Sequence, residues 1–239
     1  MTSFKKSFLK ELSGELSTAA CLGVVLAGGL SSRMGKDKAK LQRNNTNMLN
    51  FSKQLLINSG VKNIVVSGDG YDVPDKIKQS GPVGGIYSIL SSFPQVKSLL
   101  ILPVDLPFMT TKILTDLRIK GELSQKATYF EDHSIPLYLP NSAYIELFFS
   151  KIFTHSAQLD SSVVTNSPIG DSLIDSSLTS QLLTNSHKGS GKTKKKNGPS
   201  IKALLQHIPN QAIQCNDSKA LFNTNTPQQW QQAIKQFNC

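Results

Sequence analysis

A glycine pair followed by several cations is the first feature of this sequence that could do chemistry. Residues 24–40 read VVLAGGLSSRMGKDKAK, and the apolar start of this stretch ends at Gly28 and Gly29. Glycines allow the backbone to approach an anion closely and to turn its N–H groups toward it, while Arg33 and Lys38 add positive charge. We therefore interpret the stretch as a loop that wraps a polyphosphate. A basic turn between a strand and a helix is the alternative.

Oxygen ligands for a metal are the second feature. Asp105 lies between two prolines in the segment PVDLP, directly after the apolar run at 98–102. A carboxylate at the carboxyl end of a buried strand is a frequent metal ligand in doubly wound sheets, although a turn aspartate is the alternative. Near the C-terminus, Asn223 and Asn225 point to the same side if their segment is extended. Their amide oxygens could complete a magnesium or ligand shell, or they could form the turn before a helix.

Three further motifs carry weaker signals. GPVGG at 81–85 places glycines at the start of a helical pattern, which favours a ligand-facing role over a plain turn. Glu131, Asp132 and His133 could hold a metal or transfer a proton, or could form a charged hairpin tip. GSGKT at 189–193 ends like a P-loop, but the first glycine of that motif would fall on Ser186 and no apolar strand precedes it, so we do not interpret it as a nucleotide site.

The elements around these motifs follow from the hydrophobic pattern. Apolar runs at 21–27, 63–67 and 98–102 indicate buried parallel strands, and helical spacing is present at 48–60 and 81–93. Strand, helix and strand in this order form a βαβ unit, which brings the first loop to the carboxyl edge of a parallel sheet, where doubly wound folds bind ligands. The pattern also predicts further elements: a helix from Thr110 or Thr111 to about Lys120, strands at 127–130 and 135–139, a helix at 141–153 with Tyr144, Ile145, Leu147 and Phe148 buried, a short helix from Ser200, a strand at 211–215, and a last helix capped by Thr226.

The chain is expected to form one domain. Residues 1–20 are interpreted as an N-terminal extension and residues 21–239 as a single α/β domain. Between 155 and 198 the composition changes to Ser, Thr, Asn, Gly and Lys without hydrophobic period, and this length is unusual for an ordinary loop. We predict that this Ser- and Lys-rich segment is a disordered insertion.

Charge and composition exclude several classes of protein. The 239 residues carry a formal net charge of +10. Five lysines at 188–196 and the basic loop at 30–43 account for all but +1 of it, so a broad nucleic-acid face is not expected. Three widely spaced cysteines predict neither a disulfide framework nor a zinc site and favour a reducing compartment. No secretory signal and no apolar run of about 18 residues is present, and we therefore expect a cytoplasmic protein that does not enter a membrane.

Six segments of the chain form a set: LAGG at 26–29, SRMG at 32–35, DK at 37–38, GPVGG at 81–85, PVDLP at 103–107 and NTNTP at 223–227. The set resembles the molybdenum cofactor guanylyltransferase family, a branch of the nucleotidyltransferases with a glycosyltransferase-A-like fold. The resemblance covers about residues 21–154 and 200–238. It implies a three-layer α/β/α, Rossmann-like architecture with a mostly parallel sheet.

The resemblance also implies roles for single residues. The GTP phosphates would be bound by Leu26, Ala27, Gly28 and Gly29, with Arg33 nearby. Lys38 matches the lysine that contacts the nucleotide, and Asp105 matches the magnesium-binding aspartate. Asp75 lies where the family has a nucleotide-contacting aspartate, and Ser67 stands where many members have asparagine. A His-Pro-Thr segment of the family is altered here to His133-Ser134-Ile135-Pro136.

The implied reaction is the Mg²⁺-dependent transfer of GMP from GTP to molybdopterin, with release of pyrophosphate. Arg33, Lys38 and Asp105 would carry the catalysis. The nucleophile is a phosphate that is already anionic, so no general base is required. The protein would act as a monomer and could meet cofactor-delivery proteins or acceptor molybdoenzymes. A cytidylyltransferase, another small-phosphate nucleotidyltransferase and a non-catalytic nucleotide-binding adaptor remain as alternatives.

Overall fold

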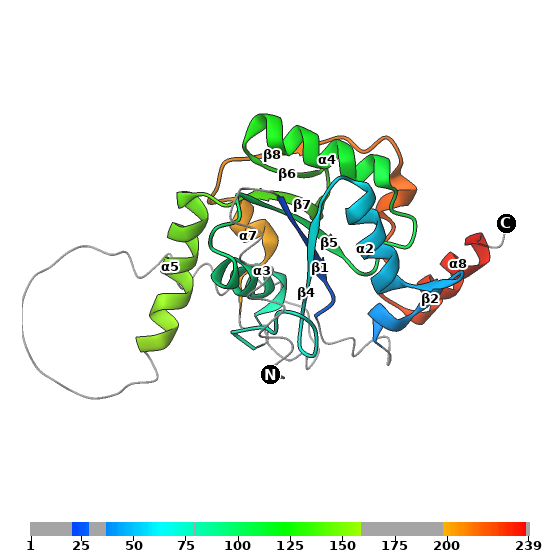
Figure 1. The fold of residues 1–239 in the computed structure, drawn as a ribbon, viewed down its shortest axis with the longest axis horizontal. Coiled ribbons are helices and arrows are strands. Elements are labelled where there is room, and N and C mark those ends of the chain that lie inside the picture. The colour runs from blue at the N-terminus through cyan, green and yellow to red at the C-terminus, as the bar shows by residue number, and fades with distance from the viewer. Residues whose placement is uncertain (1–20, 29–36, 79, 159–197, 238–239) are drawn as a thin grey trace, which may run out of the picture.

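A central sheet with helices on both faces forms the body of the molecule (Figure 1). The computed structural model describes residues 21–28, 37–78, 80–158 and 198–237. The strands of the main sheet lie in the order β4-β1-β5-β7-β6-β8. Their bounds are β1 Cys21–Leu26, β4 Asn63–Ser67, β5 Ser98–Pro103, β6 Ala127–Phe130, β7 His133–Pro140 and β8 Asn210–Ile213. Two short strands, β2 Gln42–Arg43 and β3 Thr46–Asn47, form a separate antiparallel hairpin.

Five of the six strands run in the same direction, and β7 is antiparallel to its neighbours. Strand β1 pairs in parallel with β4 on one side and with β5 on the other. The register aligns Leu26 at the end of β1 with Ser67 of β4 and with Pro103 of β5. The carboxyl ends of these three strands therefore meet at one edge of the sheet, where the loops after β1, β4 and β5 begin.

The helices cover the two faces of the sheet and complete three layers. Their bounds are α2 Met48–Asn58, α3 Gly81–Ser92, α4 Thr111–Ser124, α5 Ala143–Gln158, α7 Ile201–Leu205 and α8 Pro227–Phe237, with short 3₁₀ turns η2 Lys38–Lys40 and η3 Ser218–Leu221. Leu99 and Ile101 of β5 face the core under α3, α5 and α7, while Leu100 and Leu102 face the core under α2, α4 and α8. Side chains of a strand alternate between faces, so a continuous apolar run such as β5 supplies both cores.

The predicted three-layer α/β fold with a mostly parallel sheet is confirmed, and the predicted strands lie within a residue or two of the observed ones. Helix α4 is capped by Thr110, whose hydroxyl accepts from the N–H of Ile113 at 3.4 Å, and it continues to Ser124, past the predicted end at Lys120. None of the helices within the described ranges is long and apolar enough to cross a membrane.

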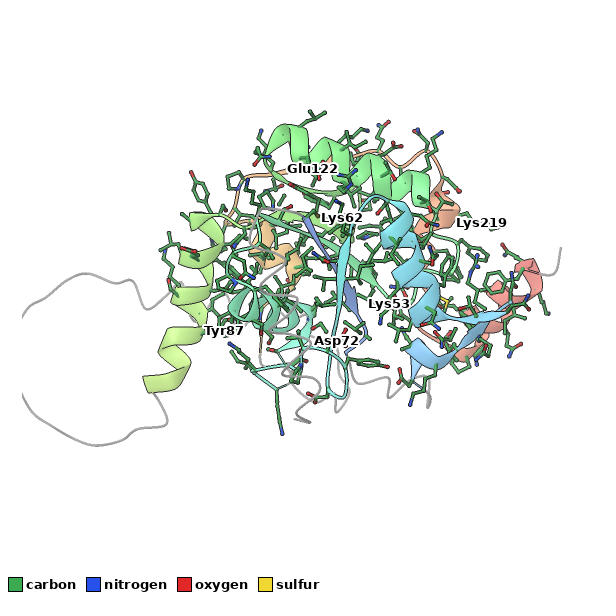
Figure 2. The ribbon with its side chains drawn as sticks, viewed as in Figure 1. Lys53, Lys62, Asp72, Tyr87, Glu122 and Lys219 are labelled. Carbon is green, nitrogen blue, oxygen red and sulfur yellow. The ribbon has the colours of Figure 1, made fainter. Side chains whose placement is uncertain are left out.

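Helix α5 corrects the prediction for residues 141–153. Tyr144 and Leu147, predicted to be buried, are 56% and 54% exposed, whereas Ile145 and Phe148 are buried as predicted. The buried stripe continues through Phe149, Ile152 and Phe153 at spacings of three and four residues. Tyr87 of α3 packs against Phe149 and Phe153, with ring centroids 5.2 Å and 4.6 Å apart (Figure 2). These aromatic contacts fix which face of α5 turns inward.

The boundaries of the predicted insertion lie partly in the described residues. Helix α5 ends at Gln158, so residues 155–158 are helical rather than irregular. Residues 159–197 lie outside the described residues, as do residues 1–20. Gly198, the first described residue after 158, packs against the backbone of Ser80, because a Cβ on Gly198 would collide with the Ser80 carbonyl oxygen. Gly198 therefore lies in space beside Ser80, the residue that precedes the first residue of α3.

Candidate active site

A lysine, an aspartate and an asparagine from three distant segments meet beyond the carboxyl ends of β1 and β5. Lys38 Nζ donates to Asp105 Oδ2 at 2.8 Å and to Asn225 Oδ1 at 2.9 Å. The side chains of Lys38 and Asp105 are 15% and 14% exposed, so water screens their ion pair only in part. The predicted site residues Lys38, Asp105 and Asn225 thus form one cluster.

Two hydrogen bonds to the Asp37 side chain fix the turn that carries Lys38. Asp37 caps the η2 turn that carries Lys38, with its carboxylate accepting from the N–H of Ala39 at 3.0 Å. The hydroxyl of Tyr71 donates to the other oxygen of the same carboxylate at 2.9 Å. Tyr71 follows the turn after β4, so this bond ties the Lys38 turn to the neighbouring strand end.

The C-terminal segment is attached to Asp105 through its backbone. Thr224 donates to the Asp105 carbonyl oxygen from its N–H at 3.0 Å and from its hydroxyl at 3.2 Å. Thr226 caps α8, as predicted, and accepts from the N–H of Gln229 at 3.2 Å. Gln229 Oε1 accepts in return from the N–H groups of Asn225 and Thr226. This reciprocal capping box fixes the backbone on which Asn225 is carried.

Two oxygen atoms near this cluster are buried without a partner. Among the buried side-chain nitrogen and oxygen atoms of the described residues, Asp105 Oδ1 and Asn223 Oδ1 have no hydrogen-bond donor. A buried acceptor without a partner costs free energy, and such an atom needs a specific explanation. Carboxylate and amide oxygens are the ligands that Mg²⁺ prefers, and Mg²⁺ needs few protein ligands because it keeps water and phosphate oxygens in its shell. The unpartnered oxygens of Asp105 and Asn223 are therefore suitable ligands for the expected Mg²⁺.

The loop after β1 differs in one respect from the sequence prediction. The N–H groups of Ala27 and Gly28 both donate to the Ser67 carbonyl oxygen at 3.0 Å, so they do not face an anion in this conformation. Gly28 and Gly68 instead allow a close backbone approach, because a Cβ on Gly68 would lie 2.7 Å from the Gly28 nitrogen and a Cβ on Gly28 would lie 3.0 Å from the Gly68 Cα. Gly29 and Arg33 lie outside the described residues. The nucleotide contacts predicted for 26–29 and for Arg33 stay predictions.

Asp75 lies beside this glycine contact. Its two carboxylate oxygens are 3.7 Å and 3.6 Å from the positions that a Cβ would take on Gly28 and Gly85, and Ser67 Oγ is 2.8 Å from the latter position. The loop after β1, the end of β4 and the first turn of α3 therefore meet at Asp75. Burial, and to a smaller extent the charge of Asp69, raise the pKa of the Asp75 carboxyl above its usual value. A carboxyl group whose pKa is raised in this way at the edge of the sheet is a candidate for a functional role.

The trio at 131–133 forms a charged hairpin tip. All three residues are exposed, and Asp132 has the positive φ of a tight turn. Across the part of the chain that the structure describes, no three His, Cys, Asp or Glu side chains are grouped so that they could hold a metal. The alternative of a metal-binding trio is therefore not supported.

Three contributors were not assigned a role from the sequence. Thr224 lies within the NTNTP motif, and its spacing gives no sign of the bonds to Asp105. Tyr71 follows a Gly-Asp-Gly turn, which is a signal for a turn but not for a partner such as Asp37. Arg43 lies in the hairpin after Lys38 and donates from Nε to the Pro107 carbonyl oxygen at 2.8 Å. No local pattern predicts any of these contacts, because each partner is far away in sequence.

Comparison with known proteins identifies the family of this chain. A family model described as the MobA-like NTP transferase domain matches residues 23–147, which is more than half of the chain. The chain belongs to this family. The matched stretch holds Lys38, Asp75 and Asp105, while Asn223 and Asn225 lie beyond it.

A curated relative agrees with this assignment. A curated molybdenum cofactor guanylyltransferase of Xanthomonas euvesicatoria pv. vesicatoria is 35% identical over 120 residues. The match covers 49% of this chain and spans 62% of the length of that relative.

Solved structures share the fold. Molybdopterin-guanine dinucleotide biosynthesis protein A from Archaeoglobus fulgidus superimposes with a TM-score of 0.58 at 16% identity, covering 91% of this chain and 98% of that one. A 2-C-methyl-D-erythritol 4-phosphate cytidylyltransferase from Thermus thermophilus gives a TM-score of 0.52 at 13% identity, covering 92% of this chain and 100% of that one. At these identities the likeness concerns the fold alone, which accommodates enzymes named for different nucleotides.

Proposed function

We propose that this protein transfers GMP from GTP to the terminal phosphate of molybdopterin and releases pyrophosphate. The observation that carries the proposal is the Lys38–Asp105 pair with the unpartnered oxygens of Asp105 and Asn223 beside it. A cation and two free oxygen ligands at one sheet edge suit a metal-bound triphosphate. The name of the Xanthomonas relative supports the choice of GTP and the molybdenum cofactor.

Asp105 and Asn223 would hold Mg²⁺ through the two unpartnered oxygens. When bound, the metal ion neutralises charge on the phosphate oxygens as pyrophosphate leaves. Lys38 would donate to a phosphate oxygen and stabilise the charge that develops in the transition state. Asn225, which accepts from Lys38 at 2.9 Å, keeps the ammonium group at this position.

The acceptor phosphate attacks the α-phosphorus in line with the departing pyrophosphate. The attacking oxygen is already anionic, so the reaction requires no side chain that removes a proton. Catalysis then consists of positioning and charge neutralisation, the two tasks that Lys38 and Asp105 can perform. Arg33 would add a further positive charge from the loop after β1.

The nucleotide would lie along the loop after β1. Leu26, Ala27, Gly28 and Gly29 line its phosphates in this proposal, with Ser67 and Asp75 at the neighbouring strand end. The N–H groups of Ala27 and Gly28 are engaged by Ser67, so phosphate contacts through them would require the loop to rearrange. Asp75 would accept hydrogen bonds from the ribose or the base.

The experiment that tests the proposal measures pyrophosphate release with purified protein, Mg²⁺, molybdopterin and each of GTP, CTP, ATP and UTP. We expect release with GTP and loss of it when Mg²⁺ is removed. Asp105→Asn should abolish turnover because it removes the anionic ligand at nearly unchanged shape. Asp116→Asn, on the exposed side of α4, is the matched control and should leave turnover unchanged. Preference for CTP would replace the guanylyl assignment by a cytidylyl one, and nucleotide binding without release would indicate an adaptor.

A further inference from the structure

Arg43 lies between two aromatic rings behind the site. Its guanidinium carbon is 3.7 Å from the ring centroid of Phe51 in α2 and 5.0 Å from that of Phe237 at the end of α8. Its Nε donates to the carbonyl oxygen of Pro107 at 2.8 Å. Burial lowers the pKa of Arg43 below its ordinary value, so the group is partly removed from water. A charged donor in such a place makes a strong and directional hydrogen bond.

The aromatic cluster around Arg43 connects the three segments that carry the site. Phe108, the residue after Pro107, packs against Phe237 and against Phe222, with ring centroids 5.4 Å and 6.1 Å apart. Phe222 directly precedes Asn223. Lys219 Nζ lies 4.7 Å from the centroid of the Phe108 ring, on the side of the molecule that carries α2 and α8 (Figure 2).

Arg43 itself follows the turn that carries Lys38, and Pro107 is two residues beyond Asp105. The hydrogen bond between Arg43 and Pro107 therefore connects the segment that carries Lys38 to the segment that carries Asp105. Its position over the rings of Phe51 and Phe237 restricts the orientation of the guanidinium group and so the direction of its Nε–H. A lysine would not reproduce this geometry.

We infer that Arg43 is a positioning residue that holds the Asp105–Pro107 segment so that the Asp105 carboxylate faces both Lys38 and the metal ion. The inference rests on the proposed function, because it takes Asp105 as a metal ligand. Residues that orient a metal ligand change metal affinity by about 10- to 100-fold when they are replaced.

The test titrates Mn²⁺ into the full chain with GTP and without acceptor, and follows free Mn²⁺ by electron paramagnetic resonance. Arg43→Met should raise the Kd for Mn²⁺ about tenfold. Removal of a nearby positive charge would by itself strengthen cation binding, so a weaker affinity reports a displaced carboxylate rather than a change of charge. GTP binding in the presence of a chelator should change less than the Kd for Mn²⁺.

Arg118→Met is the matched control. Arg118 also donates from Nε to a backbone carbonyl, that of Ser59 at 2.9 Å, but it lies on α4 beside the end of α2. The Arg118→Met substitution should lower the melting temperature without changing the Kd for Mn²⁺. If Arg43→Met does not fold, Phe237→Leu, which removes one of the two rings, should raise the Kd in the same direction by a smaller factor.

An unchanged Kd in the folded Arg43→Met variant, or in Phe237→Leu where that variant replaces it, would overturn the positioning role and leave the proposed function intact. Absence of Mn²⁺ binding in the unaltered protein would instead overturn the metal site on which both proposals depend.

Discussion

Lys38 Nζ lies 2.8 Å from Asp105 Oδ2, and this ion pair joins two residues that are 67 positions apart in the chain. One oxygen of the carboxylate is paired in this way, while the other is buried without a donor. The two oxygens of Asp105 thus have different surroundings: Oδ2 faces an ammonium group, and Oδ1 has no hydrogen-bond donor among the described residues.

Replacement of Lys38 by methionine keeps the length of the side chain and removes its charge. We expect turnover to fall about 100-fold or more, because the transition state loses one fixed positive donor. The requirement for Mg²⁺ should remain, since the free oxygens of Asp105 and Asn223 are untouched. Initial rates of pyrophosphate release measure the effect.

Lys40→Met is the matched control for Lys38→Met. The Lys40 side chain is 81% exposed and lies 3.8 Å from Asp37, so its loss should change the rate little. Equal losses in the two variants would mean that the general charge of the loop matters and that the Lys38 contacts do not.

The Asp75→Asn substitution should raise the stability of the protein and weaken its binding of GTP. The raised pKa means that the folded state favours the protonated form, so stability falls as the pH rises through the ordinary pKa of an aspartate toward the raised one. At pH 7 the charged carboxylate therefore costs stability, and asparagine removes that cost. We expect a higher melting temperature at pH 7 together with weaker GTP binding, measured by thermal unfolding and by titration. A lower melting temperature would show that the carboxylate stabilises the fold.

Tyr71→Phe should show a pH-dependent effect. Burial, and then the Asp37 carboxylate that accepts its hydroxyl, raise the pKa of Tyr71 to about 12. The folded state thus favours the neutral phenol, and this contribution is complete below pH 10 and is lost as the pH rises from about 10 to about 12. Urea unfolding of both proteins should therefore give a difference in stability of about 1 kcal/mol at pH 8 that shrinks above pH 10. A difference that stays constant to pH 11.5 would contradict the assigned bond.

Gly68→Ala should destabilise the protein more than Gly70→Ala. Both glycines have a positive φ, of 140° and 86°. A Cβ on Gly68 would lie 2.8 Å from the Gly28 Cα, whereas one on Gly70 would meet no atom within 4 Å. Strain of the backbone alone costs about 1–2 kcal/mol, and the collision at Gly68 adds to it. Chemical denaturation of the two variants measures the difference, and equal losses would mean that the contact between Gly28 and Gly68 relaxes freely.

The sequence alone indicated the buried strands and the sheet edge at which the candidate site lies. The continuous apolar runs of β1, β4 and β5 are typical of central parallel strands buried on both faces, and neighbouring parallel strands end at a common edge. Asp105 and the loop after β1 follow those strands directly, so their proximity could be predicted. Thr110 and Thr226 were predictable as caps because a helix start depends on residues next to it in sequence.

The tertiary structure decided the contacts between distant segments. The bond from Lys38 to Asn225 spans 187 positions, and no local pattern encodes it. The same holds for the bond from Arg43 to Pro107 and for the capture of the Gly28 N–H by Ser67. The buried face of α5 was mispredicted at Tyr144 and Leu147 because hydrophobicity allows two faces there, and Tyr87 selects one. Periodicity specifies which residues can be buried, whereas their partners depend on how the strands and helices pack.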